Sequence, residues 1–126
     1  MAEVIKGCGV DIIEIDRIAR AMRKPRFIQR VFTAEEQRLL SSRPVQSWAA
    51  RFAAKEAVMK ALGCGWRHGV GFQDIAILRD QNGKPLVELR GQAQEIARRQ
   101  GVAVVHLSLS HSRSVAVAYV VCVGRG

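Results

Sequence analysis

The segment at residues 46–62 combines alanine, leucine, methionine and lysine with regularly spaced larger apolar residues, and it contains no glycine or proline. This composition favours one long helix. Residues spaced four apart share a slowly drifting stripe of a helix surface, and here that stripe holds Trp48, Phe52, Glu56 and Lys60. The other large apolar residues are predicted to face the core, so Glu56 should lie at its edge and be partly buried.

The rest of the chain alternates between strand-like and helix-like patterns. Apolar runs with β character predict strands at residues 4–12, 72–79, 85–90, 102–110 and 115–123. Shorter helices are predicted at residues 14–24, 27–31, 33–40 and 92–100.

Capping and turn residues separate these elements. Thr33 and Glu36 match a capping box, so a helix should begin at Thr33. Asn82-Gly83 is a strong hairpin signal, and the last two strands are predicted to turn at residues 111–114. Four glycines between residues 63 and 71 predict a loop after the long helix.

Together these elements predict an α+β fold: a single small domain over residues 1–126 in which the long central helix packs on antiparallel hairpins. With 48% hydrophobic residues, the chain can form a core without disulfides. The last strand is almost wholly apolar, which predicts burial on both faces or a contact between subunits. An oligomer is the natural interpretation for so small a domain.

The charge of the chain is strongly positive, with 20 Lys and Arg against 11 Asp and Glu. Such an excess argues for an acidic partner, and nucleic acid is the usual one. Here, however, the basic residues gather between Arg17 and Arg30 without an acid among them, and Met22, Phe27 and Ile28 are interleaved with them. A basic helix with apolar anchors suits an acidic helical protein as well as it suits phosphate.

The cysteines and the apolar runs indicate the cellular compartment of the protein. The three cysteines are scattered without a CxxC pair, so neither a zinc site nor a disulfide framework is implied. The first residues lack the layout of a signal peptide, and no apolar run approaches the roughly 18 residues of a membrane span. These features predict a cytoplasmic protein without membrane insertion.

Two carboxylates are the candidates for chemistry. Glu56 lies among the cations Arg51, Lys55 and Lys60, and Asp11 lies near the end of the first strand. One acid among cations suits a magnesium-bound polyphosphate, because the acid holds the metal and the cations hold phosphate oxygens. The alternative is an ordinary surface Glu–Lys pair, which stabilises a helix by about 0.2–0.5 kcal/mol.

Several motifs together resemble the holo-[acyl-carrier-protein] synthases, the short class of 4′-phosphopantetheinyl transferases. The first pieces are Gly9-Val10-Asp11, Arg17, Phe52 to Ala57, and Lys60-Ala61. The likeness continues through Gly63-Cys64-Gly65, Phe72 to Ile75, Asn82 to Pro85, and Ser108 to Ser112. It covers nearly the whole chain, with the pieces in the same order, and it implies the 4′-phosphopantetheinyl transferase fold.

The resemblance also implies a reaction in fatty acid biosynthesis, a part of lipid metabolism. The 4′-phosphopantetheine group of coenzyme A would pass to a serine of apo acyl carrier protein, with release of 3′,5′-ADP. Asp11 and Glu56 would bind Mg²⁺, and Glu56, directly or through a water on the metal, would take the serine proton. Lys60 would contact the pyrophosphate. Family members of this length are homotrimers with each active site between subunits.

The same resemblance indicates which residues bind coenzyme A and which bind the acyl carrier protein. Coenzyme A contacts are implied for Arg51, Lys60, Gly63, Gly65, Asn82, Pro85, Ser110, His111 and Ser112. The acyl carrier protein is predicted to bind Arg17, Arg20, Met22, Arg23, Arg26 and Phe27. Arg17 is the firmest of these, because it alone falls on the family's fixed spacing from Asp11.

The alternative hypothesis is a basic nucleic-acid-binding module without catalytic activity. It predicts stacking aromatics on a sheet face or a recognition helix. Aromatic residues are only 6% of the chain, and this hypothesis gives no role to Asp11 or Glu56.

Overall fold

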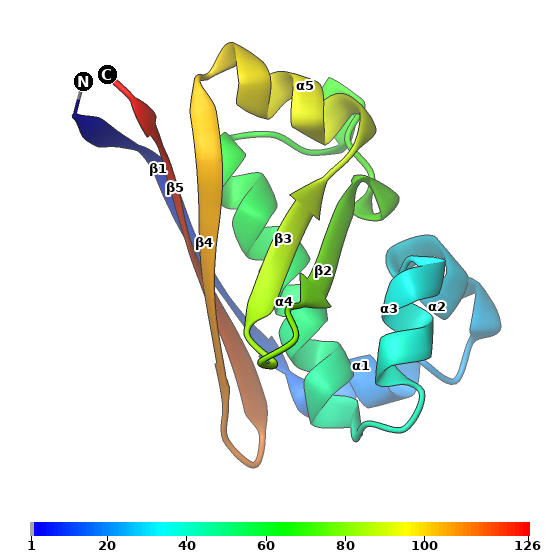
Figure 1. Ribbon diagram of the computed structural model, residues 1–126. Coiled ribbons are helices and arrows are strands. Elements are labelled where there is room, and N and C mark those ends of the chain that lie inside the picture. The colour runs from blue at the N-terminus through cyan, green and yellow to red at the C-terminus, as the bar shows by residue number, and fades with distance from the viewer. Residues whose placement is uncertain (1) are drawn as a thin grey trace.

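The computed structural model describes residues 2–126, in which a three-stranded antiparallel sheet packs against one long helix, α4 (Val45–Leu62) (Figure 1). The sheet has the order β1-β5-β4, and a separate hairpin joins β2 to β3. The strands are β1 (Glu3–Glu14), β2 (Ile75–Arg79), β3 (Pro85–Leu89), β4 (Val102–His111) and β5 (Val115–Arg125). This arrangement confirms the predicted α+β fold.

The shorter helices lie at the two ends of α4 (Figure 1). They are α1 (Ile15–Ala21), α2 (Pro25–Val31), α3 (Ala34–Leu40) and α5 (Gly91–Arg99), with 3₁₀ turns at Trp66–His68 and Phe72–Asp74. The first three lie beside the start of α4, whereas α5 lies beside the start of β4, near the end of α4. Among residues 2–126, no helix is long and apolar enough to cross a membrane.

The predicted capping box is confirmed at the start of α3. The Thr33 N–H donates to Glu36 Oε1 at 2.7 Å, and the Glu36 N–H donates to Thr33 Oγ1 at 3.1 Å. The helix predicted at 14–24 ends earlier, at Ala21, because Lys24 adopts the extended conformation that a following proline favours.

The start of β2 was predicted wrongly, at residue 72. Residues 72–74 form a 3₁₀ turn and β2 begins only at Ile75, because Asp74 Oδ2 accepts a hydrogen bond from the Gly71 N–H at 3.0 Å. This side-chain contact closes a turn in place of extended backbone.

Two glycines allow α4 to lie directly against β1. A Cβ atom on Gly7 would be 2.2 Å from the Ala61 carbonyl oxygen, and one on Gly9 would be 2.2 Å from the Ala57 carbonyl oxygen. Both glycines face the helix, since their partners on β5 are the buried Cys122 and Val120. The same face of β1 presents Asp11 two residues later, so this close approach brings Asp11 to α4.

We expect Gly9→Ala to lower the free energy of unfolding by about 1–3 kcal/mol or more, because the added methyl group forces α4 away from β1. Urea titration followed by circular dichroism measures the change. Gly71→Ala is the matched control, since a Cβ atom there meets nothing within 4 Å and its φ is negative. Equal stability of the two variants would contradict the close packing.

The last strand is buried on one face only. Ala116, Ala118, Val120 and Cys122 face α4 and are fully buried. On the other face Tyr119 is 50% exposed, and its neighbours on β1 include Val10 at 55% and Ile12 at 63%. Within one chain the first predicted alternative, burial on both faces, is therefore wrong, and the outer side of β1 and β5 is an exposed apolar surface.

Candidate active site

Asp11 and Glu56 come together where β1 crosses α4. Asp11 pairs with the buried Ala118, so its side chain lies on the helix side of the sheet. Burial raises the pKa of Glu56, and the neighbouring charge of Asp11 raises it further. The prediction that Glu56 is partly buried is confirmed, and the two carboxylates act on each other electrostatically.

Lys60, one turn after Glu56 on α4, contacts Asp11 of this pair. Its Nζ lies 2.8 Å from Asp11 Oδ1 and 3.1 Å from the Val10 carbonyl oxygen. The Lys60 side chain remains 55% exposed, so it can reach a bound anion without leaving a buried position. The positive charge of Lys60 also partly offsets the rise in the pKa of Glu56.

Two surface hollows meet at Glu56. One, the α1–α2 hollow, is lined by Asp11, Arg17, Phe27, Phe52 and Glu56, among others. The second, the glycine-loop hollow, extends past Lys60 along the loop after α4. A carboxylate shared by two hollows can act on two molecules bound side by side.

The glycine-loop hollow begins where α4 ends. Gly63 has φ 66°, and the Gly63 and Cys64 N–H groups donate to the carbonyls of Lys60 and Met59 at 3.1 and 3.0 Å. This left-handed cap turns the chain sharply away from the helix axis. Gly63 and Gly65 therefore line the hollow beside Lys60, together with the exposed Trp66.

Arg17 lines the α1–α2 hollow and is exposed there. Its positive charge lowers the pKa of Glu56, which places it close to that carboxylate. Arg20 on α1, Arg26 on α2 and Arg23 in the turn between these helices are also exposed, at the border of this hollow. Among the apolar residues of this segment, Met22 and Phe27 pack partly against the core, so they also hold α1 and α2 in place.

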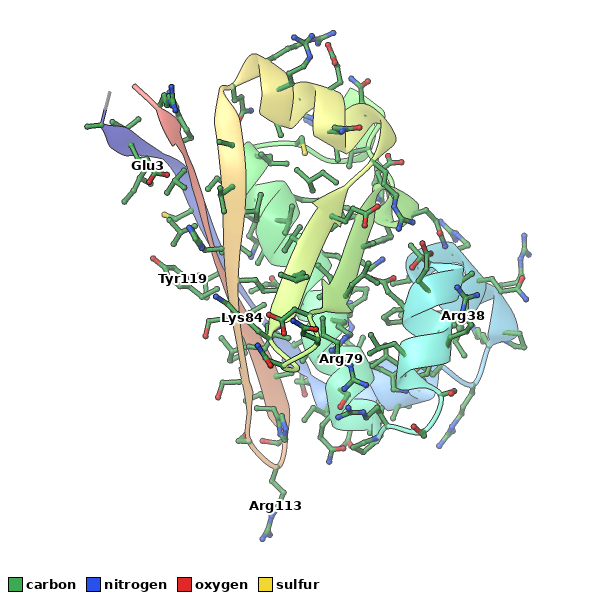
Figure 2. The ribbon with its side chains drawn as sticks, viewed as in Figure 1. Glu3, Arg38, Arg79, Lys84, Arg113 and Tyr119 are labelled. Carbon is green, nitrogen blue, oxygen red and sulfur yellow. The ribbon has the colours of Figure 1, made fainter. Side chains whose placement is uncertain are left out.

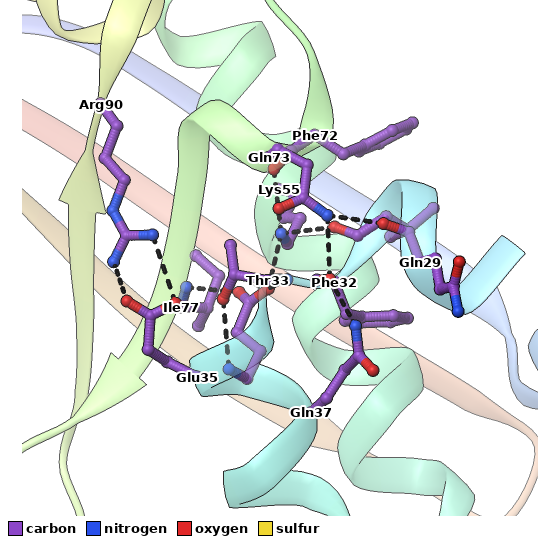
Figure 3. Close-up of polar contacts among 12 residues, drawn as sticks. Gln29, Phe32, Thr33, Glu35, Gln37, Lys55, Phe72, Gln73, Ile77 and Arg90 are labelled. Carbon is purple, nitrogen blue, oxygen red and sulfur yellow. Dashed lines mark hydrogen bonds and ion pairs between the residues drawn. The ribbon is translucent and has the colours of Figure 1, made fainter. Parts of the chain in front are cut away.

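Lys55 does not belong to this site, which corrects its prediction as one of the cations around Glu56. Its side chain is fully buried and its Nζ lies 2.7 Å from Glu36 Oε1 (Figure 3). Consecutive helix residues point about 100° apart, so Lys55 and Glu56 face different sides of α4. Burial lowers the pKa of Lys55, although Glu36 opposes that shift.

Six predicted coenzyme contacts lie away from both hollows. In the part of the chain that the structure describes, the residues lining the hollows do not include Arg51, Asn82, Pro85, Ser110, His111 or Ser112. The last three lie at the β4–β5 turn, and Asn82 and Pro85 lie at the β2–β3 hairpin. In one chain, therefore, the predicted coenzyme residues do not form a single site.

Arg51 is close to two arginines that the sequence analysis did not identify. Burial lowers the pKa of Arg51, and the charges of Arg43 and Arg79 lower it too. Its Nε is buried without a hydrogen-bond partner among the described residues. Crowded guanidinium groups favour a bound anion. No sequence pattern could have grouped these three residues, because folding alone brings them together.

The carboxylates of Asp11 and Glu56 suit a magnesium ion. Among residues 2–126 no group of three or more His, Cys, Asp or Glu side chains could hold a metal. Mg²⁺ needs only one or two protein carboxylates, because it keeps waters and binds substrate phosphates. A divalent cation between the two carboxylates would relieve the repulsion by which Asp11 helps to raise the pKa of Glu56.

Comparison with known proteins agrees with this geometry. Residues 7–120 match the profile of the 4′-phosphopantetheinyl transferase superfamily. The holo-[acyl-carrier-protein] synthase of Vibrio vulnificus (strain CMCP6) is 47% identical over 121 residues, which cover 93% of this chain and 96% of that protein. The chain therefore belongs to the 4′-phosphopantetheinyl transferase superfamily.

Solved structures place the similarity within one branch of that superfamily. A holo-(acyl-carrier-protein) synthase from Bacillus anthracis in complex with CoA (3′,5′-ADP) superposes with a TM-score of 0.79 at 36% identity, covering 98% of this chain and 99% of that one. The Helicobacter pylori holo-[acyl-carrier-protein] synthase in complex with coenzyme A gives 0.80 at 32% identity, with coverages of 91% and 98%. The relatives named here are thus transferases, which favours the transferase over the nucleic-acid-binding alternative.

Proposed function

We propose that this protein transfers the 4′-phosphopantetheine group of coenzyme A to a serine of apo acyl carrier protein and releases 3′,5′-ADP. The observation that carries the proposal is the meeting of Asp11 and Glu56 at the junction of two hollows. Transfer between two large substrates needs such a junction, because donor and acceptor must be adjacent at the reacting phosphorus. The family and its synthase relatives support the same reaction.

Asp11, Glu56 and Lys60 have different roles in the proposed reaction. Mg²⁺ held by Asp11 and Glu56 would neutralise the charge that develops on the phosphate oxygens. Lys60 is exposed beside Asp11 and holds a pyrophosphate oxygen, which favours departure of 3′,5′-ADP. Glu56, directly or through a bound water, would take the proton of the attacking serine, and a raised pKa suits a carboxylate to this role.

The two hollows take different substrates. The glycine-loop hollow receives coenzyme A, since Gly63 and Gly65 leave its backbone open beside Lys60. The α1–α2 hollow receives the carrier serine, with Arg17 in its lining and the other exposed arginines of α1 and α2 around it. An acidic helix of the carrier protein complements this positive border.

The separate group of coenzyme residues supports an assembly of several copies. Arg51, with Arg43 and Arg79, would supply an anion site for the coenzyme of a neighbouring subunit, together with the turns that carry Asn82 and His111. The exposed apolar side of β1 and β5 supports contact between copies. We propose a homotrimer in which each active site lies between two subunits.

Tyr119→Glu should dissociate this trimer, because Tyr119 lies on the central strand and points away from the body of the molecule (Figure 2). Light scattering is expected to find a trimer for the parent protein and a monomer with little activity for the variant. Gln94→Glu, on the exposed surface of α5, should remain trimeric. A fully active monomeric parent would contradict the shared site.

The proposal also covers the cellular role. The chain acts as one domain over residues 1–126, in the cytoplasm, in fatty acid biosynthesis.

A direct test of the proposed reaction is chromatographic detection of 3′,5′-ADP released from coenzyme A. Release that requires both Mg²⁺ and apo acyl carrier protein supports the proposal, and release without the carrier protein would indicate a hydrolase instead.

A further inference from the structure

We propose that Lys55 is a positioning residue, which holds an aromatic wall common to both hollows. The proposal rests on the function given above, because it assigns the hollows to the two substrates. Lys55 touches neither hollow and contributes nothing to the chemistry directly. Its contacts connect the segments that carry the wall.

The ammonium group of Lys55 has three acceptors on three different segments. Nζ lies 2.6 Å from the carbonyl oxygen of Val31, which ends α2, and 2.9 Å from that of Phe72, in the 3₁₀ turn. The third acceptor is Glu36 Oε1 on α3, at 2.7 Å. An ammonium group has three hydrogens, so the whole donor capacity of Lys55 is used inside the protein.

Glu36 extends the network further. Its Oε1 also accepts from the Thr33 N–H, and its Oε2 accepts from the Ile77 N–H of β2 at 2.6 Å. Both Lys55 and Glu36 are fully buried. A single buried ion pair thus ties α2, α3, β2 and the Phe72 turn to the helix that carries Glu56 (Figure 3).

The aromatic wall consists of the rings of Phe27, Phe52 and Phe72, and Lys55 binds the backbone near its two outer rings. Phe27 of α2 lines the α1–α2 hollow, and its ring centroid is 5.9 Å from that of Phe52. Phe52 in turn lies 5.5 Å from Phe72, which lines the glycine-loop hollow. Phe52 is one turn before Glu56 on α4, so the three rings form a continuous wall past the carboxylate where the hollows meet.

Lys55 holds both outer parts of this wall by their backbones. Its bond to Val31 fixes the end of α2, four residues after Phe27, and its bond to Phe72 fixes the turn itself. Gln73 Nε2 adds bonds from the turn to the carbonyls of Gln29 and Phe32, at 2.7 and 2.9 Å. Without Lys55, the carbonyls of Val31 and Phe72 would lose their buried donor, and Glu36 would keep only the N–H groups of Thr33 and Ile77.

The test begins with Lys55→Met, which keeps the length of the side chain and removes the donor. Because this change leaves Glu36 charged without its buried partner, Lys55→Met/Glu36→Gln is made in parallel and removes both charges. Val120→Ala is the matched control. It opens a small space in the core under β5 and lowers stability without removing any Lys55 contact or any ring of the wall.

Amide hydrogen exchange gives a readout that does not depend on activity. In the folded Lys55 variants we expect residues 25–40 and 70–74 to exchange at least about tenfold faster, while β1 and β5 stay protected. The control should exchange faster over the whole core. A uniform increase in the Lys55 variants, or no increase in these two segments, overturns the proposal.

Steady-state kinetics then tests the wall itself. A misplaced wall should raise KM for both coenzyme A and carrier protein, or lower kcat, by at least about tenfold in the folded Lys55 variants. The Val120→Ala protein should keep the parent constants below its melting temperature. Parent-like constants in the folded Lys55 variants overturn the proposal. Failure of the proposed function would be distinct, since the parent protein would then transfer nothing to the carrier.

Discussion

Glu56→Gln is expected to lower kcat/KM for phosphopantetheine transfer by about 100- to 1000-fold, as losses of a group that stabilises transition-state charge typically do. The amide keeps the size of the side chain but loses the charge that holds Mg²⁺ and the basicity that takes the serine proton. Asp11→Ala should have a similar effect, because it removes the other carboxylate of the pair and leaves Lys60 without its partner.

The fold should survive the Glu56→Gln change. Burial and Asp11 both raise the pKa of Glu56, which means that the protein disfavours its charged form. A neutral glutamine therefore costs no ionic stabilisation, and its melting temperature should equal or slightly exceed that of the parent.

Initial rates over a wide range of magnesium concentrations measure the effect of Glu56→Gln. Glu14→Gln, at the exposed end of β1, is the control and should be fully active. Near-normal turnover of Glu56→Gln at every magnesium concentration would show that this carboxylate has been assigned wrongly.

The second large effect is expected from Arg17→Glu. Arg17 lines the hollow assigned to the carrier serine, so reversing its charge should raise KM for carrier protein by about 30-fold or more, typical of a lost desolvated charge pair. KM for coenzyme A should change little. Varying both substrates in turn separates the two constants.

Two further variants make the Arg17 result specific. Arg17→Gln removes the cation without adding a carboxylate beside Glu56, so it isolates the loss of docking from disturbance of the metal pair. Arg23→Glu reverses an exposed charge at the border and should raise KM for carrier protein by less than about fivefold. A rise in KM for coenzyme A alone would place Arg17 in the nucleotide site.

Much of the fold was predictable because local signals agreed with one another. The capping box at Thr33 and Glu36, the proline at residue 25 and the Asn82-Gly83 hairpin each act over a few residues, and all three appear in the structure. The start of β2 was missed because the Asp74 side chain competes with the strand. That competition depends on a single hydrogen bond.

The candidate site was predictable only in part. The helical period placed Glu56 and Lys60 on one stripe, but the direction of Lys55 depended on which side of α4 faced α3. Lys55 points toward α3 because it pairs there with Glu36, which is distant in sequence and contacts Lys55 only after folding. The same limit applies to Arg43, Arg51 and Arg79, and to the two hollows that share Glu56.

The intact mass of apo acyl carrier protein, after incubation with this protein, coenzyme A and Mg²⁺, tests the central claim most directly. The account predicts that the carrier gains the mass of one phosphopantetheine group, and that a carrier with alanine in place of its target serine gains none. An unchanged carrier mass, with the protein folded and both substrates present, would contradict it.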